Sequence, residues 1–478
     1  MRPLLLAALL LPAAIGAQNP ALTSADSALI GRILLAEDRR DSTDAALADG
    51  MRHGDARVQM LARRARGRIR DPRFAARDSL PPLAPPPAYP EPAWRLRLRA
   101  LTAKSDCAAL GAALADSAWP VRLRAADLVD RPCAGDDAIA KTLRAWVDAL
   151  PANAARRARG SVSWHAAAHA IGALARSHPD DARARMSALA SHKQWQVRMY
   201  AARAAGVLAD TARLRTLARD PDDNVKEAAI DALSKLTGHA DDDLFIAALN
   251  ARGAQAVRAA ALALKGSPRT DASTAASAAF KRWVALGNAS AHDARAALLE
   301  AAGRPKTDDV APSARIELLP RTVALALGAD VRLRVNMSPA SGGGSFVVRL
   351  RGDVAPLMAA RILALSRAGY YDGLTWQRVE HDFVIQGGSP GATEYIGLRE
   401  FIRDELGTVP HVRGTVGMST RGHDTGDAQW FVNLKDNLRL GRDYTVFAEV
   451  VDGIDVVDAI MEGDTIASIE EVSPTQRR

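Results

Sequence analysis

The sequence predicts two structural classes in one chain: an N-terminal all-α solenoid, followed by a closed antiparallel β-barrel with two helices. Three observations indicate this division. Residues 21–305 are rich in Ala and Leu, and their apolar residues recur with the period of a helix. Residues 331–472 instead contain short apolar runs separated by loops, a pattern typical of strands in a closed barrel. A chain of 478 residues is also too long for a single hydrophobic core.

Residues 1–17 have the pattern of a cleavable signal peptide. Arg2 precedes an apolar run at residues 4–15, and the small residues Gly16 and Ala17 follow it. The run is too short to span a membrane, and no later apolar run reaches that length. We therefore expect an exported protein, periplasmic or secreted, with no membrane span.

A Val followed by a cation recurs between residues 21 and 305, each time at the start of a helical period. It occurs at Val121, Val197, Val225 and Val257. From Val225, apolar residues follow at i+3, i+4, i+7, i+8 and i+11, which places them on one helical face, and the same spacing begins at Val197.

This pattern resembles HEAT-type repeats, in which paired helices stack into a solenoid because one pair cannot bury its own apolar face. The resemblance implies a repeat domain over residues 21–305. The intervals between the Val residues are shorter than the usual HEAT period, so the number of repeats stays open. An ordinary helical bundle is the alternative.

Two polar or Pro-rich segments interrupt and end the helical region. Residues 81–92 contain seven prolines, which favour a stiff polyproline-II spacer that interrupts the solenoid or projects from it. Residues 303–315 are polar and contain two prolines, which predicts a linker. Residues 331–337 and 345–350 then have the pattern of strands. Residues 356–367 predict a helix with Pro in its first turn and a Gly just past its end.

Charge is divided unevenly between the two regions. Residues 344–478 contain 14 Lys and Arg against 20 Asp and Glu, whereas residues 1–343 contain 49 against 35. A basic surface can bind nucleic acid, but an exported protein rarely meets it, so we expect no nucleic-acid partner. The basic solenoid is expected to bind a protein partner, such as acidic clients or the chain's own acidic region, or anionic envelope polymers. A merely solvated arginine-rich surface is the alternative.

Two segments in the C-terminal region carry the densest pattern of the chain. Residues 372–388 read DGLTWQRVEHDFVIQGG, and residues 413–418 read RGTVGM and continue to QWFVNL at residues 429–434. These motifs resemble the F-H-R-V-x-x-x-F-x-x-Q-G-G and R-G-T-x-x-M…S-Q-F-F-I signatures of the cyclophilin-type peptidyl-prolyl cis-trans isomerases. Residues 444–453, YTVFAEVVDG, also resemble that family. The resemblance implies a cyclophilin-like barrel that isomerises X-Pro bonds of prolyl-containing protein clients, with no cofactor and no metal.

The resemblance also assigns roles to individual residues. It implies catalytic roles for Arg378, Phe383 and Gln386. The substrate-binding positions that it implies are Val384, Thr420, Gln429, Phe431, Leu440 and Tyr444.

The chemistry of the reaction agrees with these residue types. Amide resonance gives the X-Pro bond a rotation barrier of about 18–20 kcal/mol, and resonance is lost in the twisted transition state. The amide nitrogen then becomes more basic, so a fixed cation such as Arg378 can bind it more strongly in the transition state than in either ground state. The proline ring needs an apolar socket, and Gln386 and Gln429 are expected to hold the guanidinium or the substrate carbonyl.

Departures from the family pattern predict differences at the rim of the groove. Tyr444 stands where many members have a His, and a phenol can still supply apolar contact and one hydrogen bond. Arg439 stands where some members have a Trp that packs against cyclosporin, so we expect weak cyclosporin binding. Residues 389–412 lack the usual Gly-rich run.

Other chemical motifs are weaker. Residues 387–391 match the G-x-S-x-G nucleophile elbow, but Pro390 has no N–H for the oxyanion hole. His165 and His169 have the spacing of a shared metal site, but no third ligand is near them in sequence. Solvated loop residues are the better interpretation of two further sets: Ser419 with His423 and Asp424, and Asp424 with Asp427.

Cys107 and Cys133 are the only cysteines, and they bracket a predicted helical hairpin. Antiparallel helices bring those positions together, and export exposes them to an oxidising compartment. We expect a disulfide that closes a loop of about 27 residues and contributes roughly 3.5 kcal/mol on the chain-entropy estimate. Two separately buried thiols are the alternative.

Two functions from different classes follow. The first is an exported isomerase that assists protein folding, with the helical repeats as a scaffold for clients or partners. The alternative is a non-catalytic scaffold or holdase that only binds prolyl segments.

Overall fold

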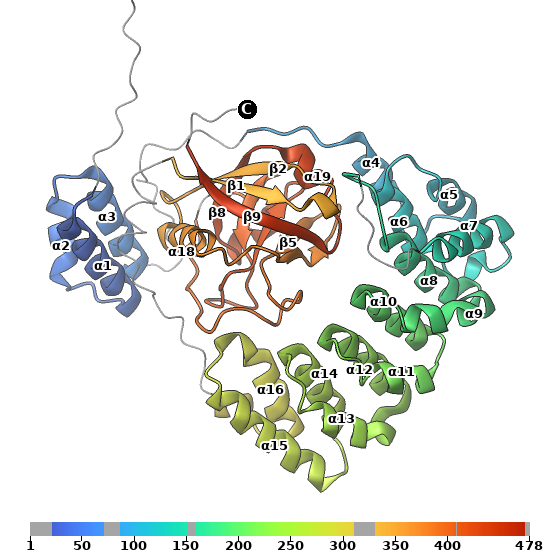
Figure 1. The fold of residues 1–478 in the computed structure, drawn as a ribbon. Helices are drawn as coiled ribbons and strands as arrows, with labels where there is room; N and C mark the ends of the chain where they lie inside the picture. Colours follow the sequence, from blue (N-terminus) through green and yellow to red (C-terminus); the bar gives the residue numbers. More distant parts are fainter. Residues whose placement is uncertain (1–21, 71–86, 151–157, 310–329, 408, 474–478) are drawn as a thin grey trace, which may run out of the picture.

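The computed structural model describes residues 22–70, 87–150, 158–309, 330–407 and 409–473 (Figure 1). The predicted signal peptide lies outside the described residues, as do parts of the Pro-rich segment and of the linker. Among the described residues, no helix is both long enough and apolar enough to cross a membrane.

The helices of the N-terminal region form two groups on different sides of the barrel. The first group consists of α1 (Ser24–Arg39), α2 (Ala45–Arg52) and α3 (Ala56–Arg70). Its buried apolar residues, such as Ile33 and Leu61, belong to the same hydrophobic core as the barrel. A buried ion pair of 2.8 Å between Arg64 and Glu405 of the barrel adds to this contact. The first group is therefore packed as part of the barrel domain.

The second group forms an arc that curves around the barrel (Figure 1). Its elements are α4 (Ala93–Ala100), α5 (Cys107–Ala113), α6 (Trp119–Leu128), η1 (Arg131–Cys133), α7 (Asp137–Asp148), α8 (His165–Ser177), α9 (Pro179–Ala190), α10 (Trp195–Val207), α11 (Thr211–Leu217), α12 (Asp223–Thr237), η2 (Gly238–Asp241), α13 (Asp242–Ala248), α14 (Ala254–Leu264), α15 (Thr270–Ala285), η3 (Ala289–Ala291), α16 (His292–Ala301) and η4 (Lys306–Asp308).

The arc has two layers of helices. Helices α8, α10, α12, α14 and α16 pack on one another in order, and α9, α11, α13 and α15 lie against them. Val197, Val225 and Val257 are buried in the first turns of α10, α12 and α14, so the Val-cation pattern does mark equivalent helices. Leu236 is 42% exposed, so the apolar face predicted for α12 ends one turn earlier. The assignment to HEAT repeats stays a prediction.

Cys107 and Cys133 are joined by a disulfide in the arc, with Cα atoms 5.5 Å apart. Cys107 begins α5 and Cys133 ends η1, just past α6. The bond therefore ties together the two ends of this helical hairpin.

The described part of the Pro-rich segment, residues 87–92, runs along the barrel and leads into α4 (Figure 1). The hydroxyl of Tyr89 donates a hydrogen bond of 3.2 Å to the carbonyl oxygen of Val450 on the barrel. Of the two interpretations of the sequence, a spacer that projects away from the helical region does not describe residues 87–92. This part of the segment lies against the barrel instead.

The C-terminal domain is a nearly closed antiparallel barrel. Its strands are β1 (Arg332–Met337), β2 (Ser345–Leu350), β3 (Thr375–Trp376), β4 (Arg378–Val379), β5 (Val384–Gly387), β6 (Thr415–Met418), β7 (Trp430–Asn433), β8 (Val446–Asp452) and β9 (Asp464–Val472). They pair in the order β3-β9-β1-β2-β8-β6-β7-β5-β4. Because β3 and β4 are separated by one residue, the two edges of the sheet meet and the barrel is almost closed.

Helix α18 (Pro356–Arg367) packs against β8 and β9, and α19 (Ile454–Asp458) packs against β2. The short helices η5 (Pro339–Ser341) and η6 (Leu438–Arg442) complete the domain. The predicted bounds of the helix at residues 356–367 are correct, and Gly369 follows it with a φ of 67°, a left-handed conformation that favours glycine. The predicted strands at residues 331–337 and 345–350 are also found, although the first begins one residue later, at Arg332.

The concave side of the arc is occupied by the barrel. Arg421 of the barrel pairs with Asp293 of α16 at 2.7 Å, and Asn224 of α12 donates a hydrogen bond of 3.1 Å to the carbonyl oxygen of Gly391. Residues 389–407, which lack the family's Gly-rich run, supply much of this contact. An ion pair and a hydrogen bond therefore join the basic helical region to the chain's own acidic domain.

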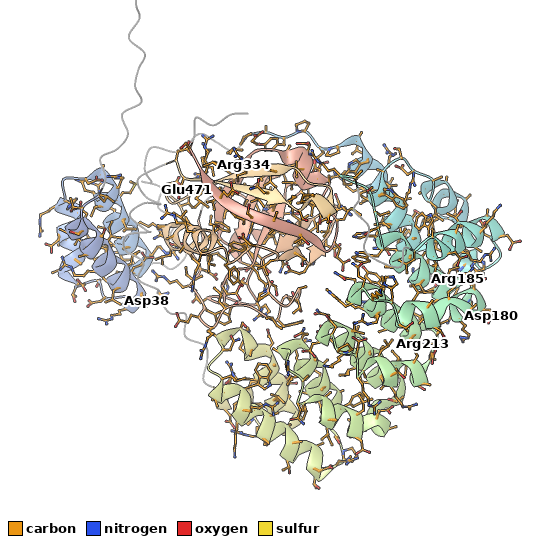
Figure 2. The ribbon with its side chains drawn as sticks, viewed as in Figure 1. Asp38, Asp180, Arg185, Arg213, Arg334 and Glu471 are labelled. Atoms are coloured by element: carbon orange, nitrogen blue, oxygen red, sulfur yellow. A yellow bond between two sulfur atoms is a disulfide. The ribbon has the colours of Figure 1, made fainter. Side chains whose placement is uncertain are left out.

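The outer surface of the arc carries many charges, several of them paired locally. Arg185 pairs with Asp148 at 2.7 Å and Arg213 with Asp210 at 3.0 Å (Figure 2 labels both arginines). Part of the positive charge of the helical region is thus neutralised within the arc.

Candidate active site

Three of the predicted site residues form a row across neighbouring strands. Arg378 on β4 is paired with Gln386 on β5, and Gln386 is paired with Phe431 on β7. Directly opposed residues of adjacent strands share one face of a sheet. The hairpin therefore places the guanidinium, the amide and the aromatic ring on the same outer face of the barrel.

Gly417 on β6 continues this row, since it is the partner of Phe431 on the other side of β7. A Cβ atom at this position would overlap the ring of Phe431. The glycine therefore leaves the space that the ring occupies, and a larger residue would push Phe431 out of the site.

An apolar socket lies beside the row. Val384, Phe431 and Leu440 are buried and form a cluster separate from the barrel core, with Phe383 and Tyr444 packed against it. The rings of Phe431 and Tyr444 meet edge to face, with centroids 5.7 Å apart. The structure thus brings together the socket residues that the sequence predicted, and Tyr444 supplies the apolar contact expected of it.

The two predicted amides bind each other and the surrounding loops. Gln386 donates from Nε2 to the hydroxyl of Ser419 at 2.9 Å and to Oε1 of Gln429 at 3.3 Å. Gln429 donates to the carbonyl oxygen of Glu394 at 3.0 Å. No hydrogen bond joins either amide to the guanidinium of Arg378 among the described residues, and the alternative, that they hold the substrate carbonyl, stays a prediction. The two amides brace the floor of the site.

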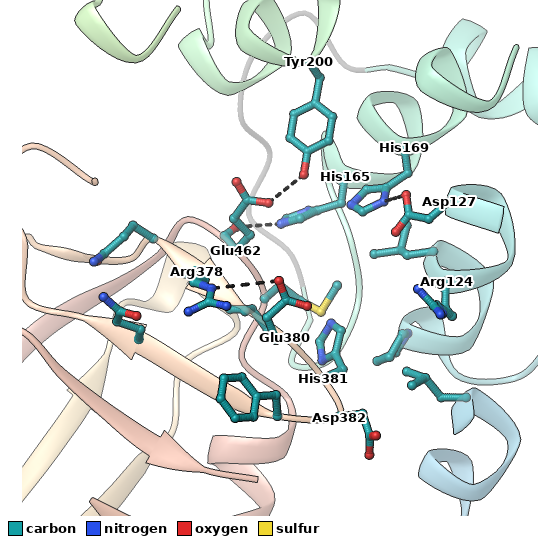
Figure 3. A pocket seen from close by; sticks show the side chains of 18 of the residues that line it. Arg124, Asp127, His165, His169, Tyr200, Arg378, Glu380, His381, Asp382 and Glu462 are labelled. Carbon is teal, nitrogen blue, oxygen red and sulfur yellow. Dashed lines mark hydrogen bonds and ion pairs between the residues drawn. The ribbon is translucent and has the colours of Figure 1, made fainter. Parts of the chain in front are cut away.

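The guanidinium of Arg378 stands at the mouth of the site. Its side chain is 47% exposed, and its nearest carboxylate is that of Glu380 at 3.9 Å (Figure 3). Its guanidinium carbon lies 5.8 Å from the ring centroid of Phe383. The guanidinium carbon of Arg439 lies 4.9 Å from the same centroid. Within the described residues no hydrogen bond engages the side chain of Arg378, which lines the cleft beside the site.

Sequence analysis missed His411, which supports the socket from behind. It is fully buried, stacks on Phe431 with centroids 5.7 Å apart, and lies 3.0 Å through Nε2 from the carbonyl oxygen of Tyr444. Burial lowers the pKa of His411, so the neutral ring is favoured. Thr420 is one of the predicted substrate-binding positions. It lies two residues past the end of β6 and is half-buried.

The site opens into a cleft of about 1070 Å³ between the barrel and the arc (Figure 3). Arg378, Glu380 and Phe383 belong to the barrel wall. The opposite wall comes from α4, α6, α8 and α10, and includes Arg124, Asp127, His169, Tyr200 and Arg203. Nothing in the sequence indicated that the helical region faces the predicted catalytic residues.

Polar contacts join the two walls at one end of the cleft. Tyr200 donates a hydrogen bond of 2.8 Å to Glu462 of the barrel, and Nε2 of His165 lies 2.7 Å from the carbonyl oxygen of the same residue (Figure 3). Burial raises the pKa of Glu462. Burial also opposes protonation of His169, but its hydrogen bond to Asp127, together with nearby negative charge, outweighs burial and raises the pKa of His169.

The weaker motifs of the sequence have structural roles. Ser389 donates a hydrogen bond of 2.8 Å to the carbonyl oxygen of Ile396 and so shapes a turn. His165 and His169 bind different partners, Glu462 and Asp127. No group of three or more His, Cys, Asp or Glu side chains among the described residues is arranged to hold a metal ion.

The barrel and its socket with an adjacent cation define the class of this protein as a peptidyl-prolyl isomerase. The family model described as "Cyclophilin type peptidyl-prolyl cis-trans isomerase/CLD" matches residues 334–476. A peptidyl-prolyl cis-trans isomerase of Helicobacter pylori is 35% identical over 130 residues, which cover 26% of this chain and 80% of the relative. The chain therefore belongs to the cyclophilin-type family, and its activity is peptidyl-prolyl cis-trans isomerisation.

Other relatives match the same part of the chain. Peptidyl-prolyl cis-trans isomerase B of Escherichia coli is 37% identical over 129 residues, 24% of this chain and 78% of the relative. Among solved structures, a cyclophilin-type isomerase of Cryptosporidium parvum is 23% identical, with a TM-score of 0.27 over 30% of this chain and 98% of its own.

Proposed function

We propose that this chain is an exported prolyl isomerase that binds an extended client segment between its barrel and its helical arc. The observation that carries this proposal is the shared cleft, which has Arg378 and Phe383 on one wall and helices α6, α8 and α10 on the other. A folded protein surface is too broad for such a cleft, whereas an extended peptide can thread along it. The substrate class is therefore unfolded or flexible chain segments that contain proline.

Arg378 is assigned the central catalytic role. When the proline ring is held in the socket, the neighbouring guanidinium can donate to the amide nitrogen, which accepts a hydrogen bond only once the bond has twisted. The interaction is absent in both planar ground states, so it lowers the barrier without tightening ground-state binding. No covalent step and no proton transfer are needed.

The socket performs the complementary task of holding the ring while the N-terminal side of the bond rotates. Val384, Phe431 and Leu440 are buried and on short strands or a short helix of the barrel, so they form a preformed surface. Gln386 and Gln429, braced by each other, keep the floor of the site rigid. A rigid socket keeps the proline ring in one place beside the guanidinium.

The helical wall is proposed to select clients by charge. No ion pair within the described residues holds Arg124 or Arg203, although Arg203 lies over the ring of Tyr200 at 4.8 Å. The carboxylate of Asp382, in contrast, is engaged by Arg99 and Lys435. The unpaired cations favour client segments with acidic residues near the proline.

Export is proposed from the N-terminal apolar run and is supported by the disulfide between Cys107 and Cys133. Disulfides persist in oxidising compartments and are rare in reducing ones. The test is N-terminal sequencing of the protein recovered from a bacterial host after cell fractionation. Cleavage near residue 17 and recovery outside the cytoplasm are expected, and an intact cytoplasmic chain would contradict export.

The client-binding role is tested with two peptides that share one X-Pro core and differ in flanking residues, Glu in one and Lys in the other. The full-length protein is expected to isomerise the Glu peptide with the higher kcat/KM at low salt. Arg124→Glu should reduce or reverse this preference. Lys281→Glu makes the same charge change on α15, away from the cleft, and should leave the preference unchanged.

Equal kcat/KM values for both peptides, or the same loss in Arg124→Glu and Lys281→Glu, would reject the helical wall as a binding surface. The alternative of a holdase without catalysis would require that the wild-type protein bind a prolyl peptide and leave its exchange at the uncatalysed rate.

A further inference from the structure

Helix α4 of the arc contacts the turn that connects β4 to β5. Arg95 donates from Nε to the carbonyl oxygen of His381 at 3.0 Å, and Arg99 pairs with Asp382 at 3.1 Å. The ring of Trp94 meets that of His381 edge to face, with centroids 5.9 Å apart. Three side chains of one helix thus hold two adjacent residues of one turn.

This turn controls the placement of two site residues. It spans residues 380–383 and is closed by hydrogen bonds from Phe383 N to Glu380 O at 2.7 Å and from Glu380 N to Val384 O at 2.9 Å. Only two residue pairs make up the β4–β5 ladder, and β4 lies at an edge of the sheet. So short a hairpin has few bonds of its own. Lys435 and Asn437 of the barrel hold the turn at Asp382 and Phe383, and the contacts from α4 add to theirs.

Arg95 is well suited to this task because it is buried completely and paired at every group. Besides His381, it donates to the carbonyl oxygen of Leu434 at 2.8 Å and to Asp458 at 2.7 Å. Asp458 is also held by Arg413 of the barrel at 2.7 Å. The guanidinium therefore links α4 to three separate segments of the barrel in one fixed geometry.

The contact with Leu434 reaches the site by a second route. The N–H of Leu434 donates to the carbonyl oxygen of Phe383 at 3.0 Å, so Leu434 is bound to Arg95 through one backbone group and to Phe383 through the other. Arg95 thus fixes the turn both at His381 and next to Phe383.

We propose that Arg95 is a positioning residue for the isomerase reaction, through which the helical arc holds Arg378 and Phe383 in their active arrangement. The arc is then part of the catalytic unit. This inference rests on the roles proposed above for Arg378 and Phe383. A buried, fully paired arginine adds little to stability, because the free-energy cost of its desolvation offsets much of its electrostatic attraction. Its hydrogen bonds do, however, impose one specific geometry on the groups that they join.

The test compares Arg95→Ala with Arg97→Ala in the full-length protein. Arg97 lies two residues along the same helix, is 46% exposed and pairs with Asp116 of the arc. NMR exchange spectroscopy on a prolyl peptide gives the maximal exchange rate, and titration gives the peptide Kd. Arg95→Ala is expected to lower the maximal rate about 10- to 100-fold with little change in Kd, because small displacements of a catalytic group have effects of this size. Arg97→Ala should match wild type.

Arg95→Lys is the conservative variant and covers the case in which Arg95→Ala does not fold. Lysine keeps the charge toward Asp458 but cannot also reproduce the fork that reaches His381 and Leu434. We expect a folded protein with a rate between those of wild type and Arg95→Ala. A folded Arg95→Lys protein with the wild-type rate would overturn the proposal, as would an Arg95→Ala protein that loses only peptide affinity.

Arg378→Ala is measured in parallel to separate the two proposals. If Arg378→Ala keeps the wild-type rate, the assigned catalytic role fails, and the positioning role fails with it. If Arg378→Ala is inactive while Arg95→Ala and Arg97→Ala have equal rates, only the positioning role fails.

Discussion

Arg378 and Gln386 are direct partners in the two-pair ladder between β4 and β5, yet no hydrogen bond between their side chains holds them together. The amide of Gln386 is directed to Ser419 and Gln429, and the guanidinium is left at the mouth of the cleft. The pairing positions the cation through the backbone and leaves its donors available to the substrate.

Arg378→Ala should therefore remove most of the catalysis and little of the fold. Losing a preorganised donor that acts on the transition state typically lowers the rate by about 10²–10³. Exchange spectroscopy on a prolyl peptide measures the rate, and circular dichroism checks the fold. A folded Arg378→Ala protein with the wild-type rate would show that Arg378 does not take part in catalysis.

Phe431→Ala should act mainly on substrate affinity. The ring supplies socket area that is used by the ground states and the transition state alike, and burying a side chain of this size contributes roughly 1.5–3 kcal/mol. We expect the Kd for a prolyl peptide to rise about 10- to 100-fold. The maximal exchange rate should change less than in Arg378→Ala. An unchanged Kd measured by titration would remove Phe431 from the socket.

Reduction of the bond between Cys107 and Cys133 should destabilise the arc. On the chain-entropy estimate the loss is about 3.5 kcal/mol. Urea unfolding with and without reductant measures it, and the double variant Cys107→Ala/Cys133→Ala should unfold at the lower midpoint in both conditions. Two thiols that react with a maleimide in denatured, non-reduced protein would show that the bond does not form.

Acid should weaken the packing around the β4–β5 turn. Burial lowers the pKa of His381 to about 3, and the nearby positive charges of Arg95 and His169 act in the same direction. Since the unfolded chain takes up this proton near pH 6.5, the contribution of His381 to stability is complete above that pH and is lost as the pH falls toward 3.

The measurement is the urea midpoint between pH 8 and pH 4. His381→Gln should lose less stability on acidification than wild type, because glutamine does not titrate. Identical slopes for His381→Gln and wild type would contradict the assignment.

Cyclosporin should bind weakly to the wild-type protein. The guanidinium of Arg439 lies over Phe383 at 4.9 Å and would have to be desolvated against an apolar macrocycle. Arg439→Trp should tighten binding roughly tenfold, the value of one aromatic contact of about 1.4 kcal/mol. Arg334→Trp on β1 is the control and should have no effect (Figure 2). Nanomolar affinity of the wild type in a titration would refute the prediction.

Much of the barrel could be predicted because its signals are local. The helix at residues 356–367 has Pro at its start and Gly after its end, and β1 has alternating burial over its six residues. The socket residues could be proposed because the motifs around them resemble those of the cyclophilin family. Cys107 and Cys133 could be paired because a helical hairpin brings its own two ends together.

In the helical region, local sequence patterns predicted the helices but not their contacts with the barrel. Its sequence determined that helices form and that Val197, Val225 and Val257 start equivalent ones, because a helical face is defined by spacing within one segment. Tertiary structure alone decided that the arc encloses the barrel, that Arg124 faces the active site, and that Arg95 reaches Asp458, 363 residues away. Nothing in the residues around Arg95 distinguishes it from the other arginines of the arc. Its role depends on which carbonyl oxygens and carboxylates a distant segment brings within hydrogen-bonding distance, and only the folded chain specifies that.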